Sequence, residues 1–185
     1  NTLALIKNNT MKKLITIFTL AVSTFTFSQN STTLKSNDIV INPVALVLGA
    51  VNVEYERIIS ENSGIGVTTS FLLDDYIIDD NNGFSITPYY NYYFGKKRAN
   101  GFYIGGYCSI NSGDVEKSYY VSSQYGGYTM YTTEKETNFG VGFKFGGKWV
   151  VKNDIVLEIG TGLGRNFGGE NKVNTTGMLG IGKRF

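Results

Sequence analysis

Hydrophobic and polar side chains alternate with a period of two along most of the chain from about residue 38 onward. The clearest stretch is 137–150, where Phe139 and Phe143 share one face with other apolar residues, and Gly140 and Lys144 share the opposite face. Successive side chains of a β-strand point to opposite faces, so this period is typical of strands rather than helices. The pattern therefore predicts a protein built of β-strands.

Eight stretches with this alternation are separated by turn residues, and they are 38–48, 51–59, 65–73, 84–94, 101–111, 137–150, 155–164 and 175–185. Stretches of this length and period are typical of membrane β-barrels. An even strand count places both termini at one end of a barrel. We expect short turns at that end (60–64, 95–100, 151–154) and longer loops at the other (74–83, 112–136, 166–174). We predict an all-β fold, an eight-stranded antiparallel up-and-down transmembrane β-barrel.

The two faces of the predicted strands differ in a way that indicates which one points outward. One face is rich in glycine, which would leave a water-facing exterior almost without solubilising side chains but suits the crowded interior of an eight-stranded barrel. The other face is large and apolar, and it has aromatic residues such as Phe94, Phe102 and Trp149 near strand ends, where membrane barrels place their girdles. We therefore expect the apolar face to contact lipid.

The first residues have the features of an export signal. Lys12 and Lys13 follow Met11, an apolar stretch follows them, and small residues precede Gln29. We expect a signal peptide at 11–28 that is cleaved between Ser28 and Gln29, an upstream extension at 1–10 that takes no part in the fold, an N-terminal lead at 29–37 and a barrel domain at 38–185.

Charge and composition exclude several functional classes. Cleavage after Ser28 removes the extension and the signal, with three of the 17 basic side chains and none of the 15 acidic ones, which leaves a net charge of about −1 and no basic footprint for nucleic acid. The chain contains no His, the residue that most often acts as general base. We expect no enzymatic activity, no cofactor and no metal site.

Charged residues on the predicted inward face are candidates for a lumenal charge network. Buried charges are tolerated when they are paired and hydrogen-bonded, and an eight-stranded interior is usually filled by side chains. We therefore expect a mostly filled lumen, with a pathway for solutes or ions as the alternative. The candidate residues are Glu54, Glu56, Lys144, Lys148, Glu158 and Arg184.

The longest predicted external loop, 112–136, is rich in tyrosine around a Gly126–Gly127 turn. Tyrosine offers a large amphipathic contact surface, and an exposed hairpin edge can recruit a partner strand. An adhesin-like role, with an extracellular protein or surface ligand as partner, is therefore an alternative to a purely structural role. The residues that would carry it are Tyr119, Tyr120, Tyr125, Tyr128 and Tyr131.

The C-terminal residues are the sharpest match to a known family. Phe185 is a terminal aromatic residue, and the apolar Ile181 and Leu179 precede it at alternate positions. Lys183 interrupts this apolar alternation. The segments NVEYER at 52–57 and GGKW at 146–149 add weaker matches. On these residues the chain resembles the small outer-membrane β-barrel domain family, the OmpX/OmpW-like barrels of Gram-negative bacteria. The resemblance implies a monomer in outer-membrane lipid with periplasmic termini. It also implies that Phe185, Ile181 and Leu179 are read by the barrel-assembly machinery, and that a conduit, if present, is narrow and OmpW-like.

Overall fold

A computed structural model describes residues 34–73, 83–122, 126–169 and 171–185, and the part from Lys35 onward forms one compact unit. The expected signal peptide, its cleavage site at Ser28 and Gln29, the extension 1–10, the lead up to residue 33 and Tyr125 lie outside the described residues. The strands are β1 (Asn37–Ile41), β2 (Ala50–Ile58), β3 (Ser63–Leu72), β4 (Phe84–Tyr93), β5 (Gly101–Val121), β6 (Tyr128–Val150), β7 (Ile155–Phe167) and β8 (Val173–Arg184).

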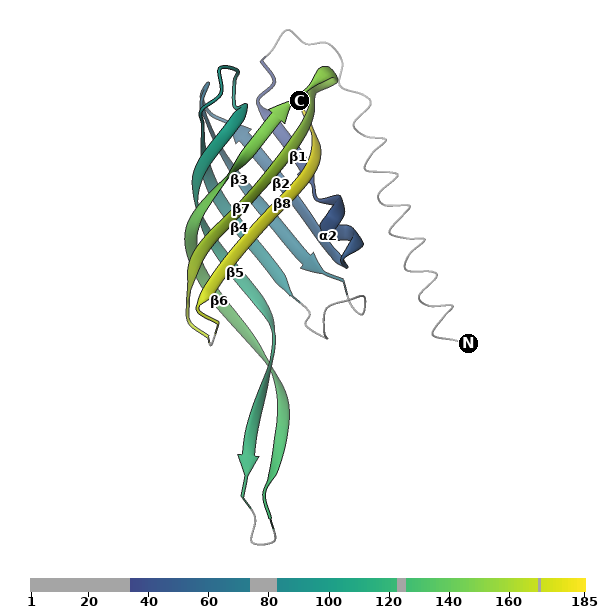
Figure 1. The fold of residues 1–185 in the computed structure, drawn as a ribbon, viewed down its shortest axis with the longest axis vertical. Coiled ribbons are helices and arrows are strands. Elements are labelled where there is room, and N and C mark those ends of the chain that lie inside the picture. Colours follow the sequence, from purple (N-terminus) through teal and green to yellow (C-terminus); the bar gives the residue numbers. More distant parts are fainter. Residues whose placement is uncertain (1–33, 74–82, 123–125, 170) are drawn as a thin grey trace, which may run out of the picture. The chain divides into compact units, whose positions relative to one another are not determined.

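Each strand pairs antiparallel with the next one along the chain, and β1 pairs with β8 to close the barrel (Figure 1). This arrangement confirms the predicted all-β, eight-stranded, up-and-down topology. The connections β2–β3, β4–β5 and β6–β7 lie at the end of the barrel that carries the C-terminus (Figure 1), and the last of them contains a short 3-10 turn, η2 (Lys152–Asp154). We call this end the turn end.

The first strand is shorter than the alternation predicts. Residues 38–48 were expected to form one strand, but β1 stops at Ile41 and the helix α2 (Pro43–Val47) follows. Pro43 cannot donate to a strand ladder and suits the first turn of a helix, and the Asn42 side chain caps that turn by accepting a hydrogen bond from the Ala45 amide at 3.0 Å. As a result β1 pairs with β8 over 181–184 only, and α2 packs beside β2 and β8. The described residues contain no helix that is long and apolar enough to span a membrane.

The segment 112–136, expected to be a loop, is instead a paired extension of two strands. β5 and β6 stay in register from Gly101↔Lys148 to Val121↔Tyr128, whereas the neighbouring strands pair with them only as far as Ser112 and Phe139. The described residues beyond these points, within 113–138, therefore form a two-stranded ribbon that projects past the barrel (Figure 1). We call it the hairpin extension.

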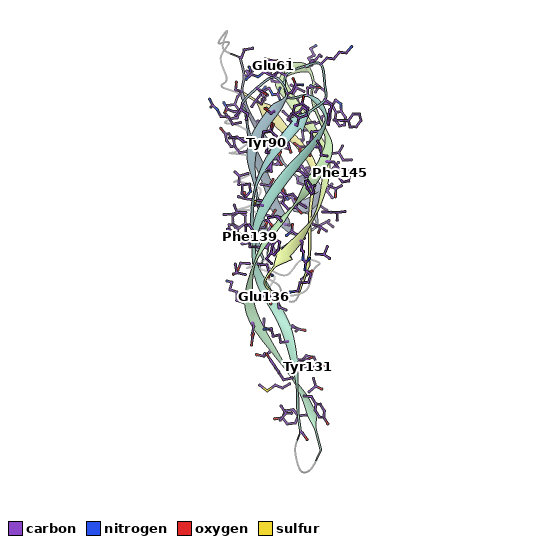
Figure 2. The ribbon with its side chains drawn as sticks, turned by 90° about the vertical axis from the view of Figure 1, so that its left-hand side faces the viewer. Glu61, Tyr90, Tyr131, Glu136, Phe139 and Phe145 are labelled. Atoms are coloured by element: carbon purple, nitrogen blue, oxygen red, sulfur yellow. The ribbon has the colours of Figure 1, made fainter. Side chains whose placement is uncertain are left out.

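Within the barrel, polar residues face inward and apolar residues face outward, the reverse of a water-soluble protein. The fully buried side chains include Glu54, Glu56 and Lys148, whereas Phe102 is 69% exposed and Phe143 is 73% exposed. Side chains such as Tyr90 and Phe145 stand on the outside of the barrel wall (Figure 2). The strand alternation thus separates a charged core from an apolar surface.

Candidate functional site

The lumenal charge cluster lies inside the barrel near the turn end. β2 and β6 are four strands apart in the closed order, so they stand on opposite sides of the barrel and their inward side chains face each other across the lumen. β2 supplies Glu54 and Glu56, and β6 supplies Lys144 and Lys148. The ion pairs between these strands therefore connect the two sides of the wall.

Lys148 is the centre of the cluster and has no exposed surface. Its Nζ lies 3.1 Å from Glu56 Oε2, 3.3 Å from Glu54 Oε1 and 3.0 Å from Glu158 Oε2. Glu158 is the direct cross-strand neighbour of Lys148 on β7. One ammonium group therefore contacts three carboxylates at once, and buried charges are tolerated when they are paired and hydrogen-bonded in this way.

Lys144 forms a second, smaller group two inward positions further along β6. Its Nζ lies 3.3 Å from Glu54 Oε2 and 3.7 Å from the centroid of the Tyr89 ring. The hydroxyl of Thr68, the cross-strand neighbour of Glu54 on β3, donates to the same carboxylate oxygen at 3.1 Å. Glu54 is thus shared by both lysines and a hydroxyl.

Tyrosine hydroxyls complete the coordination of the carboxylates. Tyr93 donates to Glu56 Oε1 at 2.7 Å, Tyr89 donates to Glu56 Oε2 at 3.1 Å, and Tyr103 donates to Glu158 Oε1 at 2.8 Å. The sequence reasoning did not include these tyrosines in the network. Their inward positions in the alternation of β4 and β5 were the available signal.

Arg184, a member of the expected network, pairs with an aspartate and not with one of its glutamates. Its guanidinium donates to both carboxylate oxygens of Asp38, Nε to Oδ1 at 2.7 Å and Nη2 to Oδ2 at 2.9 Å. Asp38 is the direct cross-strand neighbour of Arg184, and its carboxylate lies 3.9 Å from Lys148 Nζ. Arg184 therefore joins the cluster through Asp38, a residue that the expected network did not include.

The β4–β5 turn closes the lumen at the turn end. Ala99 is fully buried, and the carbonyls of Arg98 and Ala99 accept hydrogen bonds from the Arg184 guanidinium at 2.8 and 2.9 Å. Ala99 packs with Ile58, Tyr93 and Tyr103 in one apolar cluster. The charge cluster is therefore covered by a packed turn.

Glycines on the inward face make room for the lumenal tyrosines. A Cβ placed on Gly142 would lie 2.6 Å from the Tyr107 ring, and one placed on Gly160 would lie 2.2 Å from the Tyr103 hydroxyl. Tyr107 in turn donates to Asn174 Oδ1 at 2.8 Å, and Asn174 donates to Ser109 and Asn166. A neutral layer of polar side chains thus fills the lumen on the side of the hairpin extension.

The packing around Lys144 leaves one small space. A cavity beside Lys144, lined in part by Glu54, Tyr103 and Met178, has room for about one water molecule. The four carboxylates of the cluster already accept hydrogen bonds or ion pairs from basic side chains and hydroxyls. The chemistry of the cluster is therefore suited to joining the strands and blocking the lumen.

Aromatic side chains gather in two belts on the outside of the barrel, one near each end of strands β4 to β7. At the turn end, the Phe102 and Trp149 rings meet edge to face with centroids 5.7 Å apart, and Tyr92 packs on Phe94 at 5.4 Å. At the opposite end, Phe139 packs beside Phe167 with centroids 6.3 Å apart. Apolar residues occupy the outward positions between the belts.

Four of the five candidate tyrosines are among the described residues of the hairpin extension, and all four are exposed: Tyr119, Tyr120, Tyr128 and Tyr131. Tyr131 lies well beyond the barrel in Figure 2. On one face Lys117 Nζ lies 2.6 Å from Glu134 Oε2, and this contact holds the pKa of the Glu134 carboxyl below its ordinary value. The structure thus places the tyrosines on an exposed ribbon, away from the lumenal charge cluster.

The C-terminal candidates all lie on the outward face of the last strand or directly after it. Leu179, Ile181 and Phe185 are between 39% and 48% exposed. Lys183, which interrupts their alternation, donates from Nζ to the Asn153 carbonyl at 2.7 Å. The apolar side chains therefore remain accessible from outside the barrel.

Residues 6–177 match the model of a family described as "Protein of unknown function (DUF3575)". The chain is similar in structure to the Yersinia pestis outer membrane protein Ail in a phospholipid bilayer nanodisc (TM-score 0.46, 15% identity, 82% of this chain and 100% of that one) and to a crystal structure of Ail, the attachment invasion locus protein (0.46, 14%, 82% and 100%). It is also similar to the N-terminal β-barrel domain of Pseudomonas aeruginosa OprF (0.48, 12%, 82% and 98%). No curated protein sequence matches the chain.

Proposed function

The chain belongs to the DUF3575 family of proteins of unknown function, and we propose that it is a non-enzymatic β-barrel of the Gram-negative outer membrane with a structural or surface role. In this proposal the apolar wall contacts lipid, the lumen is plugged by the charge cluster, and the protein acts as a monomer. The observation that carries it is the apolar wall between two aromatic belts.

The distance between the belts supports a membrane location. Phe139 and Trp149 stand at opposite ends of the apolar wall on the same strand, β6, ten residues apart. Ten residues at roughly 3.4 Å each, tilted by about 35–45° from the barrel axis, rise roughly 24–28 Å. The apolar band of outer-membrane barrels is about 25 Å tall, so the wall fits one bilayer.

The proposed orientation follows from the unequal connections. In outer-membrane barrels the short turns are periplasmic and the long loops extracellular, so the turn end with both ends of the barrel domain would face the periplasm. The hairpin extension would then stand outside the cell. Phe185, Ile181 and Leu179 would be the residues that the barrel-assembly machinery reads, after cleavage of the signal between Ser28 and Gln29.

Cell fractionation tests the proposal most directly. The full chain, expressed in a Gram-negative host, should appear in the outer-membrane fraction, require detergent for extraction and migrate differently on gels before and after boiling. In planar bilayers it should show no steady conductance, because Lys148 and its partners fill the lumen. Recovery as a freely soluble protein would overturn the membrane location, and steady single-channel currents would favour the narrow conduit instead.

A second candidate function is binding of an extracellular protein or surface ligand by the hairpin extension. The supporting observation is that its four described tyrosines are exposed on a ribbon whose strands pair only with each other beyond Ser112 and Phe139. Such a ribbon offers amphipathic side chains and free strand edges.

Replacement of Tyr119, Tyr120, Tyr128 and Tyr131 by Ser tests this role in assays of cell and protein binding. We expect binding to fall at least tenfold if these side chains carry it, and a matched variant with Ser at the lipid-facing Tyr90 and Tyr92 provides the control. Unchanged binding by the hairpin variant would restrict the protein to the structural role.

A further inference from the structure

We infer that the turn end of the barrel is a binding surface for anionic phospholipid headgroups. This inference rests on the membrane location proposed above, and it starts from the charges on the turns and strand ends that follow the aromatic belt. Seven basic side chains lie there, from Lys35, Arg57, Lys96–Arg98, Lys152 and Lys183. Two acidic side chains, Glu61 and Asp154, lie on the same turns. We call the seven basic side chains the basic rim.

Contacts within the structure bring separate segments of the basic rim together. The Arg98 guanidinium donates to Ser36 Oγ at 3.1 Å, and the Arg57 guanidinium reaches Asn37 Oδ1 at 3.4 Å. Lys35 forms an ion pair with Asp154, next to the carbonyl that accepts from Lys183. The charges therefore form one surface around the barrel mouth.

Three lysines of the basic rim are available to an external ligand. Lys96, Lys97 and Lys152 are exposed and form no ion pair or hydrogen bond within the described part of the chain. They lie within three residues of Phe94 or Trp149 in the sequence, and both of these belong to the aromatic belt. A lipid whose tails contact this belt would thus present its headgroup at the height of these lysines.

The opposite end of the barrel has no such excess of positive charge. Among the described residues there, the hairpin extension, the end of β7 and the β7–β8 connection carry four acidic and four basic side chains. The acidic ones are Asp114, Glu116, Glu134 and Glu136, and the basic ones are Lys117, Lys135, Arg165 and Lys172. A general affinity for negative charge would not be confined to one end, so the asymmetry indicates a ligand that meets only the turn end.

A phospholipid surface fits these observations better than other anionic partners. Basic side chains beside a bilayer attract anionic lipids, and this attraction falls off within a Debye length of the surface. The basic rim adjoins the aromatic belt over several strands, which places the charges at that surface. An anionic polymer in the periplasm would not require this continuity.

Spin-labelled lipids test the inference on the full chain inserted into phosphatidylcholine vesicles. We expect labelled phosphatidylglycerol to associate with the protein roughly two- to threefold more strongly than labelled phosphatidylcholine, with a preference that falls as salt is added. The variant K96Q/K97Q/K152Q should lose the preference, giving a ratio of about one, and the variant K117Q/K135Q/K172Q, which removes three charges at the other end, should retain it.

The possible results separate this inference from the proposed function. Failure of the wild-type chain to insert into vesicles would overturn both. Insertion without a preference for phosphatidylglycerol, or equal loss in the two variants, would overturn the lipid surface alone. Co-sedimentation of the detergent-solubilised chain with purified peptidoglycan, lost in K96Q/K97Q/K152Q while the lipid ratio stays near one, would assign the basic rim to the cell wall and overturn the inference as well.

Discussion

The barrel and the hairpin extension are made of the same two strands, β5 and β6, yet their side chains serve different environments. Inside the barrel each of these strands pairs on both edges, and its two faces contact a charged interior and an apolar exterior. Beyond Ser112 and Phe139 they pair only with each other, and both faces are open. The comparison shows that the strand period fixes which residues share a face, whereas the neighbouring strands decide what that face contacts.

The two regions also use ion pairs differently. Lys148 lies fully buried among carboxylates from three other strands, whereas Lys117 pairs with Glu134 on the open ribbon. A buried charge left without its partner costs several kcal/mol, but exposed pairs contribute little. The barrel should therefore depend on its ion pairs for stability, and the hairpin extension should not.

Removal of Lys148, the central cation of the cluster, should have the largest effect on stability. In Lys148→Met three glutamates lose their shared partner, and we expect the free energy of unfolding from vesicles to fall by about 3–5 kcal/mol. Denaturant titration followed by tryptophan fluorescence measures the change. Lys117→Met, the matched variant on the ribbon, should leave the unfolding midpoint unchanged, and equal losses in the two variants would contradict the distinction.

Replacement of an inward glycine should lower the stability by a smaller amount, and replacement of an outward glycine should not lower it. A Cβ at Gly142 would meet the Tyr107 ring and the Leu163 carbonyl, whereas one at Gly177, on the outward face, meets nothing within 4 Å. Gly142→Ala should thus lower the free energy of unfolding by about 1–3 kcal/mol through overpacking. Gly177→Ala should be neutral or stabilise slightly, and the same titration would refute close lumenal packing if both variants behaved alike.

Deletion of most of the hairpin extension should have a still smaller effect on the stability of the barrel. When residues 114–135 are replaced by Asn-Gly, the pairing of Gly113 with Glu136 can lead into a two-residue turn. We expect the free energy of unfolding to stay within about 0.5 kcal/mol, because no barrel strand other than β5 and β6 pairs with the deleted part. Loss of heat-modifiable gel migration in the deletion variant would show that the barrel needs its extension.

Most of the barrel could be predicted from the sequence because the bilayer-facing positions impose a strict period of two. The alternation predicted eight strands and the inward positions of Glu54, Lys148 and Glu158. It missed α2, where Pro43 and the Asn42 cap stop the strand although Val44–Leu48 is apolar. It also missed the length of β5 and β6, because outside the apolar wall neither face is consistently apolar and alternation no longer marks a strand.

The partners inside the lumen could not be predicted from the alternation alone. Period two shows that Asp38, Tyr93 and Arg184 point inward, but contacts across the lumen depend on the register of strands that are distant in sequence. Asp38 meets Arg184 because β1 and β8 close the barrel with these two residues opposite each other. Glu56 lies in register with Gly66 and Tyr89 across β3, and its carboxylate also reaches Tyr93, two inward positions further along β4.

The smallest effect that we expect is the loss of the Lys117–Glu134 ion pair on the hairpin extension at low pH. The hydrogen bond and charge of Lys117 lower the pKa of Glu134 below its ordinary value of 4.5. A group with a lowered folded-state pKa stabilises the fold above its unfolded pKa and loses this contribution as the pH falls through its folded pKa. The hairpin extension should thus keep the pair at neutral pH and lose it only below about pH 4.5, whereas Lys117→Gln should return the Glu134 titration to its ordinary range. NMR of the Glu134 side-chain carboxyl measures both titrations, and identical curves for wild type and variant would show that the pair does not form on the ribbon in solution.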